Sequence, residues 1–254
     1  MVRKSREEKL KSEHLPERVQ ERIRHTRKES VLSDSVLGGI DGAVTTFAVV
    51  AGARGGGFAP MVTIVLGLAN LLADGFSMAV SNYEAQTAQK DEVKKLKAQE
   101  ERQVSEIPEG EKEEIRAIFR IKGFRGDILE KIVATITANP QVWIDTMLHE
   151  ELGVSEERKK PVLSAAATFT TFLVIGIIPL IPFLLPLPLF SVPLPFSVGL
   201  TALTFLGIGM TKGKILQRPV FASGIQTLFT GGAAAVLAYV TAILVRNIYP
   251  DVGG

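Results

Sequence analysis

Residues 31–86 read VLSDSVLGGIDGAVTTFAVVAGARGGGFAPMVTIVLGLANLLADGFSMAVSNYEAQ, and this stretch decides the fold. It holds two apolar runs of about 20 residues, each long enough to cross a hydrocarbon core of about 30 Å as a helix. A glycine-rich turn at residues 54–60 separates the two runs. We therefore expect two antiparallel membrane-spanning helices, and the glycines of the first predict close approach to a neighbouring helix.

Each expected span carries an acidic residue inside its apolar run, Asp41 in the first and Asp74 in the second. A carboxylate in hydrocarbon costs at least a few kcal/mol, so such residues usually face a polar pathway. Asp41 lies about 12 Å from the face where the first span enters, at about Ser33. Asp74 lies about 9 Å from that face, because its span returns from Pro60 on the opposite side. Both acids are thus expected at a similar depth.

Polar side chains recur on the second span at three- and four-residue spacing, which aligns them on one face. They are Asn70, Asp74, Ser77, Ser81 and Glu84. Met78 flanks this stripe, and two carboxylates, an amide oxygen and a thioether suit a divalent transition metal such as Fe²⁺ or Mn²⁺. The alternative is that Asp41 and Asp74 only bond neighbouring helices. Two acids at one depth beside a methionine favour the metal pathway.

Charge is unevenly distributed along the 254 residues, of which 46% are hydrophobic and 22% charged. The charges gather in residues 1–30 and 84–160, a pattern typical of a membrane protein with an extramembrane part. A net charge of +2 indicates no nucleic-acid partner, and the absence of cysteine excludes thiolate metal sites. The charged N-terminus predicts no cleavable signal peptide. Enzymatic chemistry has no support, because no P-loop, nucleophile elbow or zinc-hydrolase motif is present.

Lysine and arginine predict the orientation, because cytoplasmic connections of membrane proteins are enriched in both. Residues 1–30, 84–160 and 211–218 are the basic connections, so we expect the N-terminus in the cytoplasm and the C-terminus outside. The fold class is then an all-α integral membrane protein with five transmembrane helices and a cytoplasmic helical domain between spans 2 and 3. The expected parts are a charged N-terminal segment at 1–30, spans 1 and 2 at 31–84, the cytoplasmic domain at 85–160, spans 3 to 5 at 161–247 and an external tail at 248–254.

Local signals predict the finer boundaries. The second span continues without glycine or proline until Pro108, which predicts one helix of about 45 residues. In the domain, we expect Asp127 to cap one helix, Asn139 with Pro140 to begin another and Gly153 to end it. The last three spans are expected at 161–186, 194–210 and 220–246.

Acidic side chains also recur at helical spacing in the 85–160 domain. They are Glu100, Glu101 and Gln103 near the end of the long helix, Glu111 and Glu114 on the next helix, and Glu150 and Glu151 beside Met147 on a third. Taken alone, acidic helix faces are usually just solvated.

The pattern S-D-x-x-x-G-x-x-D-G in the first span, followed by L-A-x-x-x-A-x-G-x-S-M in the second, resembles the vacuolar iron transporter family of ferrous and manganese exporters. The resemblance covers about residues 31–247. It implies that the domain binds metal through glutamates and an M-x-x-x-E-L-G motif, which Met147 and Glu151 match. Glu100, Glu111 and Glu114 fall on matching positions. Gln103 stands where the plant-type pattern has a further glutamate, so that ligand is weaker or is replaced by Glu101 or Glu106.

A second departure lies in the membrane. Asn70 stands where the plant-type pattern has a glutamate, and Asp74 where it has a small residue. The carboxylate has in effect moved one helical turn. The resemblance also implies a homodimer paired through its first spans, in a cell membrane if the source is prokaryotic and in a vacuolar membrane if it is eukaryotic.

We therefore expect export of Fe²⁺, with Mn²⁺ as a second candidate, in exchange for protons. No permanently bound cofactor is expected, although the cytoplasmic domain can take another divalent metal. Two alternatives stay open. One is a membrane-anchored metal sensor or storage protein without transport. The other is a proton-coupled carrier of a small organic cation, which would not need Met78 or Met147.

Overall fold

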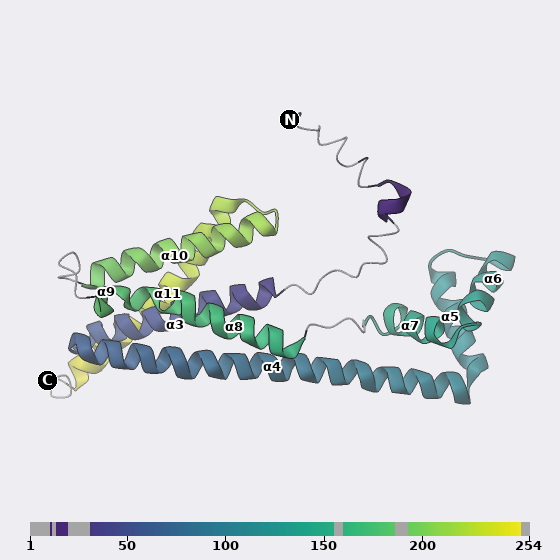
Figure 1. Cartoon of the computed structure of the whole chain (residues 1–254), viewed down its shortest axis with the longest axis horizontal. Helices are drawn as coiled ribbons and strands as arrows, with labels where there is room; N and C mark the ends of the chain where they lie inside the picture. The colour runs from purple at the N-terminus through teal and green to yellow at the C-terminus, as the bar shows by residue number, and fades with distance from the viewer. Residues whose placement is uncertain (1–10, 12–13, 20–30, 155–159, 186–192, 250–254) are drawn as a thin grey trace. The chain divides into compact units, whose positions relative to one another are not determined.

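The computed structural model describes residues 11, 14–19, 31–154, 160–185 and 193–249, and all regular secondary structure in these residues is helical (Figure 1). The chain divides into two units, residues 1–30 and 31–254. In the first unit, residues 16–19 form a helical turn. All the helices described below belong to the second unit.

Five helices in the described residues are long and apolar enough to cross a membrane. They are α3 (Leu32–Gly55), α4 (Pro60–Glu106), α8 (Pro161–Gly176) with its continuation through η1 (Ile178–Leu180) and α9 (Ile181–Leu184), α10 (Pro193–Ile215) and α11 (Val220–Ile248). This agrees with the five predicted spans. The third span is interrupted near Pro179 and Pro182, where we expect a kink because proline cannot donate a helical hydrogen bond.

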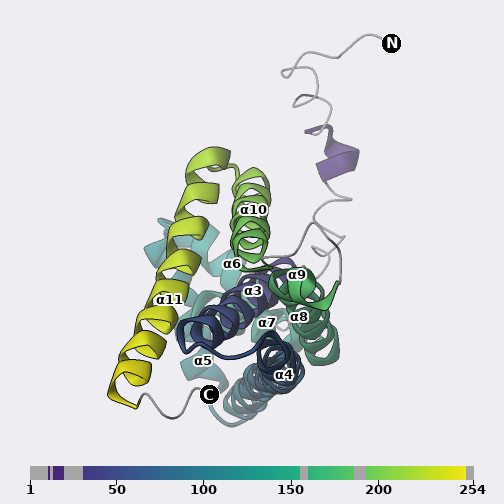
Figure 2. The ribbon, with the colours of Figure 1, turned by 90° about the vertical axis from the view of Figure 1, so that its left-hand side faces the viewer.

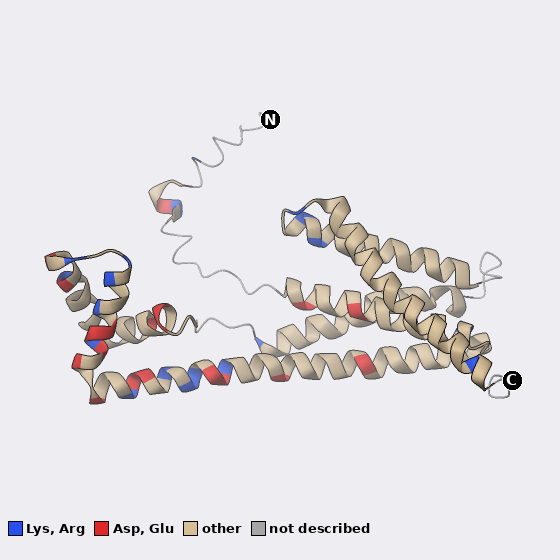
Figure 3. Ribbon diagram, turned by 180° about the vertical axis from the view of Figure 1, so that it is seen from behind, with Lys and Arg blue, Asp and Glu red and all other residues tan. Residues whose placement is uncertain are grey.

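Helix α4 is one unbroken helix of 47 residues, as its sequence predicts. Its length of about 70 Å is more than twice the thickness of a hydrocarbon core, so roughly half of it projects beyond the membrane. Charged side chains concentrate on that half and on the short helices that follow (Figure 3). Helix α10 reaches Ile215, a full turn beyond the predicted end at residue 210, so it occupies part of the expected 211–218 loop.

Three short helices, α5 (Pro108–Ile121), α6 (Gly126–Thr137) and α7 (Pro140–Glu150), form the helical domain between α4 and α8. Their apolar faces enclose one small core, made of Ile115, Leu129, Val133, Trp143 and Met147. The side chain of Asn139 caps α7 as predicted, by accepting hydrogen bonds from the backbone N–H groups of Gln141 and Val142. Gly153 follows α7 with a φ of +64°, which favours glycine at this helix end.

The predicted cap at Asp127 is wrong. Helix α6 already begins at Gly126, its N-cap is Arg125, and no side chain caps it. Asp127 therefore lies inside the first turn, where its charge still favours the helix N-terminus.

Helix α3 is the centre of the membrane bundle and packs against α4, α8, α10 and α11 (Figure 2). Its glycines let α8 come into backbone contact. A Cβ atom on Gly38 would lie 2.3 Å from the carbonyl oxygen of Thr168, and one on Gly42 would lie 2.4 Å from that of Phe172. The predicted close approach is therefore made within the chain, to α8.

Candidate functional site

The two membrane acids lie on the antiparallel helices α3 and α4 (Figure 1), which a side-chain hydrogen bond connects. The amide nitrogen of Asn82 on α4 donates to Oδ1 of Asp34 on α3 at 3.2 Å. Along α3, Asp41 lies seven residues, or about 10.5 Å, beyond Asp34. Along α4, Asp74 lies eight residues, or about 12 Å, from Asn82 in the same direction. The two acids thus lie at nearly one level on two helices that pack against each other.

Asn70 and Met78 lie one helical turn before and one helical turn after Asp74 on α4. Both side chains are partly buried. The amide nitrogen of Asn70 is buried and has no hydrogen-bond partner in the described part of the chain. A buried donor without a partner costs about 1–3 kcal/mol, so a partner or ligand at this point would be stabilising.

Asp41 also lines a cavity of about 480 Å³ between α3 and α10. Its other polar lining residues are Ser33 and Lys212, and the remaining lining side chains are Leu32, Val36, Leu37, Ile40 and Leu216. From the sequence, Lys212 is expected only as a basic residue of the 211–218 loop. Helix α10 extends past that expected boundary, and this extension makes Lys212 one of the residues that line the cavity beside Asp41.

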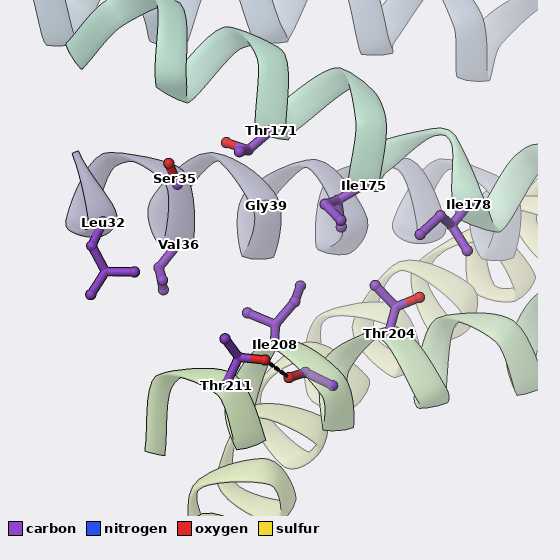
Figure 4. Close-up of a pocket in the computed structure, with 11 residues that line it drawn as sticks. Leu32, Ser35, Val36, Gly39, Thr171, Ile175, Ile178, Thr204, Ile208 and Thr211 are labelled. Carbon is purple, nitrogen blue, oxygen red and sulfur yellow. Dashed lines mark hydrogen bonds between the residues drawn. The ribbon is translucent and has the colours of Figure 1, made fainter. Parts of the chain in front are cut away.

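A second cavity of about 460 Å³ lies between α3, α8 and α10 (Figure 4). The lining of this cavity is apolar except for four hydroxyl-bearing residues from three helices. They are Ser35, Thr171, Thr204 and Thr211. This lining carries no acid or base, so it offers no strong ligand for a cation.

The helical domain contains a second group of acids. Glu100 on α4 is 4% exposed and Glu111 on α5 is 0% exposed. Burial, followed by the charges of Glu114, Glu100 and Glu151, raises the pKa of Glu111 to about 7. Burial and the charges of Glu114 and Glu100 likewise raise the pKa of Glu151 to about 7. Four acids from α4, α5 and the end of α7 thus interact with one another.

Several oxygens in this group are buried without a hydrogen-bond partner among the described residues. They are both carboxylate oxygens of Glu111, Oε2 of Glu100 and Oε1 of Gln103. A buried carboxylate oxygen of this kind is stabilised by a proton, a hydrogen-bond donor or a cation, and the amide oxygen of Gln103 by a donor or a cation. In the described ranges, no three His, Asp or Glu side chains are arranged closely enough to hold one metal ion. A shared metal would therefore have to draw these carboxylates inward.

The other predicted domain ligands fall in different places. Met147 is fully buried and packs in the apolar core with Ile115 and Trp143. Glu150 forms an ion pair with Lys122. Glu101 is exposed, as is His149. Burial therefore separates Glu100 and Glu111 from acids that are their neighbours in sequence.

No role was predicted for Asn82 or Asp34, which join α4 to α3, although Asp34 is the first aspartate of the S-D-x-x-x-G-x-x-D-G pattern. Asn82 follows Asn70, Asp74 and Met78 at the same four-residue spacing, and this repeat was the available signal. Asp34 precedes Asp41 by seven residues and so lies on nearly the same face of α3.

The sequence model of the VIT family matches residues 32–242. Vacuolar iron transporter 1 of Oryza sativa subsp. japonica is 30% identical over 217 residues, which cover 85% of this chain and 86% of the relative. The vacuolar iron transporter of Toxoplasma gondii is 31% identical over 213 residues, covering 80% and 70%. Vacuolar iron transporter 1 of Tulipa gesneriana is 27% identical over 226 residues, covering 89% and 91%.

Proposed function

The chain belongs to the VIT family, and on that premise we propose that it exports Fe²⁺ from the cytosol in exchange for protons, with Mn²⁺ as a second substrate. The printed names of its relatives describe transporters. The observation that carries the proposal is the placement of Asp41 and Asp74 at one level on facing helices of an apolar bundle.

The membrane step uses the charge of these two carboxylates. Facing acids repel each other, and a divalent cation between them removes that repulsion. The amide oxygen of Asn70 and the thioether of Met78 lie one turn away on either side, and the thioether favours a transition metal over Mg²⁺ or Ca²⁺. Protons arriving from the opposite side compete for the same carboxylate oxygens, so metal release and proton uptake are coupled.

The helical domain gathers the metal before this step. Glu100, Glu111, Glu114 and Glu151 supply negative charge, and several of their oxygens are buried without partners. Gln103 adds a neutral amide oxygen one turn from Glu100. Met147 reaches the metal only if its thioether turns out of the apolar core, so the acids form the primary ligands in this proposal.

The remaining assignments follow the charge pattern. The N-terminus and the helical domain lie on the cytosolic side, because both are rich in lysine and arginine. Two copies form the working unit, with the partner copy closing the α3 surface that carries the Asp41 cavity.

Metal flux into proteoliposomes tests the proposal. Purified protein is reconstituted around a metal-sensitive dye, and Fe²⁺ entry is recorded with and without an acidic lumen. Export coupled to protons predicts entry that accelerates when the lumen is acidic. Entry that is indifferent to the pH gradient would refute proton exchange. Tight Fe²⁺ binding without entry would instead support the sensor or storage alternative.

A further inference from the structure

A polar cluster ties three membrane helices together at the end of the bundle where α3 begins. The amide nitrogen of Asn82 donates to Oδ1 of Asp34 at 3.2 Å and to Oγ1 of Thr168 at 2.8 Å. Asp34 is 5% exposed and Thr168 is 0% exposed. The hydroxyl of Thr168 donates to the backbone carbonyl oxygen of Ser164 on the same helix. The Thr168 hydroxyl oxygen can therefore still accept from Asn82. One amide therefore joins α3, α4 and α8.

This cluster lies about two helical turns from each of the proposed transport residues Asp41 and Asp74. Seven residues along α3 turn through nearly two full circles, so Asp34 and Asp41 lie on almost the same face, about 10.5 Å apart. On antiparallel α4, the distance from Asn82 to Asp74 is about 12 Å. A slip of one helical turn, about 5.4 Å, would move Asp41 away from the level of Asp74.

Helix α8 provides a firm support for the cluster. A Cβ atom added to Gly38 or Gly42 would lie 2.3 or 2.4 Å from a carbonyl oxygen of α8. The backbones of α3 and α8 are therefore already in contact. Thr168, whose carbonyl meets Gly38, is also the residue whose side chain bonds Asn82. The amide on α4 is thus held against a pair of helices that have little room to shift.

We propose that Asp34, Asn82 and Thr168 are positioning residues for metal transport, which hold α3, α4 and α8 in the register that sets Asp41 level with Asp74. The proposal rests on the proposed transport function. It assigns the three residues no direct contact with the transported metal. Their loss therefore weakens metal binding at Asp41 and Asp74 through displacement of those residues.

The first test compares Asn82→Ala and Thr168→Val with Thr171→Val. Thr171 lies on the same helix, and in the described residues its hydroxyl donates to backbone carbonyl oxygens of α8, those of Ala167 and Thr168. We expect Asn82→Ala and Thr168→Val to raise the KM for Fe²⁺ flux at least fivefold, with thermal stability near that of the parent. Thr171→Val leaves KM unchanged. Equal KM values in all four proteins would overturn the proposal.

The second test measures the register without transport. The chain contains no cysteine, so Leu37→Cys on α3 and Leu72→Cys on α4 give one pair of spin labels. Both leucines are exposed, at 52% and 58%. Double electron–electron resonance on spin-diluted protein should show a shifted or broadened distance when Asn82→Ala is added. An unchanged distance would overturn the proposal even if the parent protein proved to transport no metal, which would refute the proposed function separately.

An exchange of partners completes the test. Asp34→Asn and Asn82→Asp each alter the cluster, whereas the double variant restores one carboxylate facing one amide. We expect both single variants to raise KM and the double variant to return it to within twofold of the parent. A double variant with a higher KM than either single variant would overturn the proposal. It would show that the hydrogen bond between the two side chains is not what transport requires.

Discussion

The membrane bundle and the helical domain each bring acids together, but they do so by opposite means. In the bundle, acids are scarce, and Asp41 and Asp74 lie at nearly one level on α3 and α4, which Asp34 and Asn82 connect by a hydrogen bond. In the domain, acids are abundant, and only burial singles out Glu100 and Glu111 from exposed neighbours such as Glu101. An acid in an apolar span is conspicuous from its surroundings in sequence, whereas an acid in a charged helix becomes conspicuous only after folding.

The domain itself contains the same contrast on a smaller scale. The pKa of Glu130 is lowered by hydrogen bonds with the Arg116 guanidinium on the surface. The pKa of Glu111 is raised by burial and by neighbouring acids, and its oxygens have no hydrogen-bond partner in the described residues. Glu130 is thus part of a surface ion pair. The charged form of Glu111 is disfavoured, and a proton or a cation would stabilise this side chain.

The largest expected effect concerns the bundle. Asp41→Asn and Asp74→Asn should each lower Fe²⁺ flux by about 100-fold, because a lost interaction with a charged group of up to about 3 kcal/mol corresponds to that factor. Asp91→Asn is the matched control, since Asp91 is an exposed acid on α4 that pairs with Lys94. Flux measured in proteoliposomes at the parental rate for Asp41→Asn would place the membrane site elsewhere.

The buried domain acids should have a smaller effect, and on a different parameter. Glu111→Gln should raise the KM for Fe²⁺ about tenfold with kcat unchanged, because the domain gathers metal but does not carry it across. Glu113→Gln is the control, since Glu113 is exposed and pairs with Arg116. If steady-state flux shows the same KM for both variants, Glu111 is a structural residue of the domain.

Stability should depend on pH in a direction set by the raised pKa values. Glu111 and Glu151 bind a proton more tightly in the folded chain, with pKa values of about 7, than in the unfolded chain. Stability is therefore higher at low pH and falls as pH rises through about 7. We expect the thermal midpoint, followed by tryptophan fluorescence, to rise by a few degrees between pH 8 and pH 6.

Glu111→Gln separates this effect from the rest of the chain, because glutamine stays neutral throughout. The variant should flatten the pH profile and raise the midpoint at pH 8. A steeper profile in the variant would contradict the assignment. Added Fe²⁺ should raise the thermal midpoint of the parent more than that of the variant. A metal stabilises the folded chain only as far as the chain binds it, and the variant lacks the Glu111 carboxylate.

Lys212→Gln should have a modest effect in the bundle. Lys212 lines the same cavity as Asp41, so removing its positive charge should lower the KM for Fe²⁺ about threefold. Lys214→Gln, two residues along α10, is the matched control because Lys214 does not line the cavity. A higher KM for Lys212→Gln in the flux assay would indicate that the lysine supports the site.

The smallest expected effect is that of Glu150→Gln. Glu150 pairs with Lys122 on a half-exposed surface, and such pairs contribute less than about 1 kcal/mol. The thermal midpoint and the KM for Fe²⁺ should stay close to the parental values. A KM shift as large as that of Glu111→Gln would return Glu150 to the metal-binding group.

The five long apolar helices, the unbroken α4 and the similar level of Asp41 and Asp74 along their helices could all be predicted from the sequence. These features follow from local rules, because a bilayer requires a long apolar run and a helix advances by a constant rise per residue. The Asn139 cap is equally local. The predicted cap at Asp127 is wrong because the N-cap of α6 is Arg125, two residues before Asp127. The first residue of the helix is Gly126, whose φ is +56°.

Which glutamates are buried, that Lys212 lines the cavity beside Asp41, and which side chains connect α3, α4 and α8 became known only from the packing of the helices. Asn82 bonds residues 48 and 86 positions away, on two other helices. Glu100, Glu111 and Glu151 likewise come from different elements. Such groupings depend on how whole helices pack, and a periodicity within one segment carries no information about the residue that faces it from another.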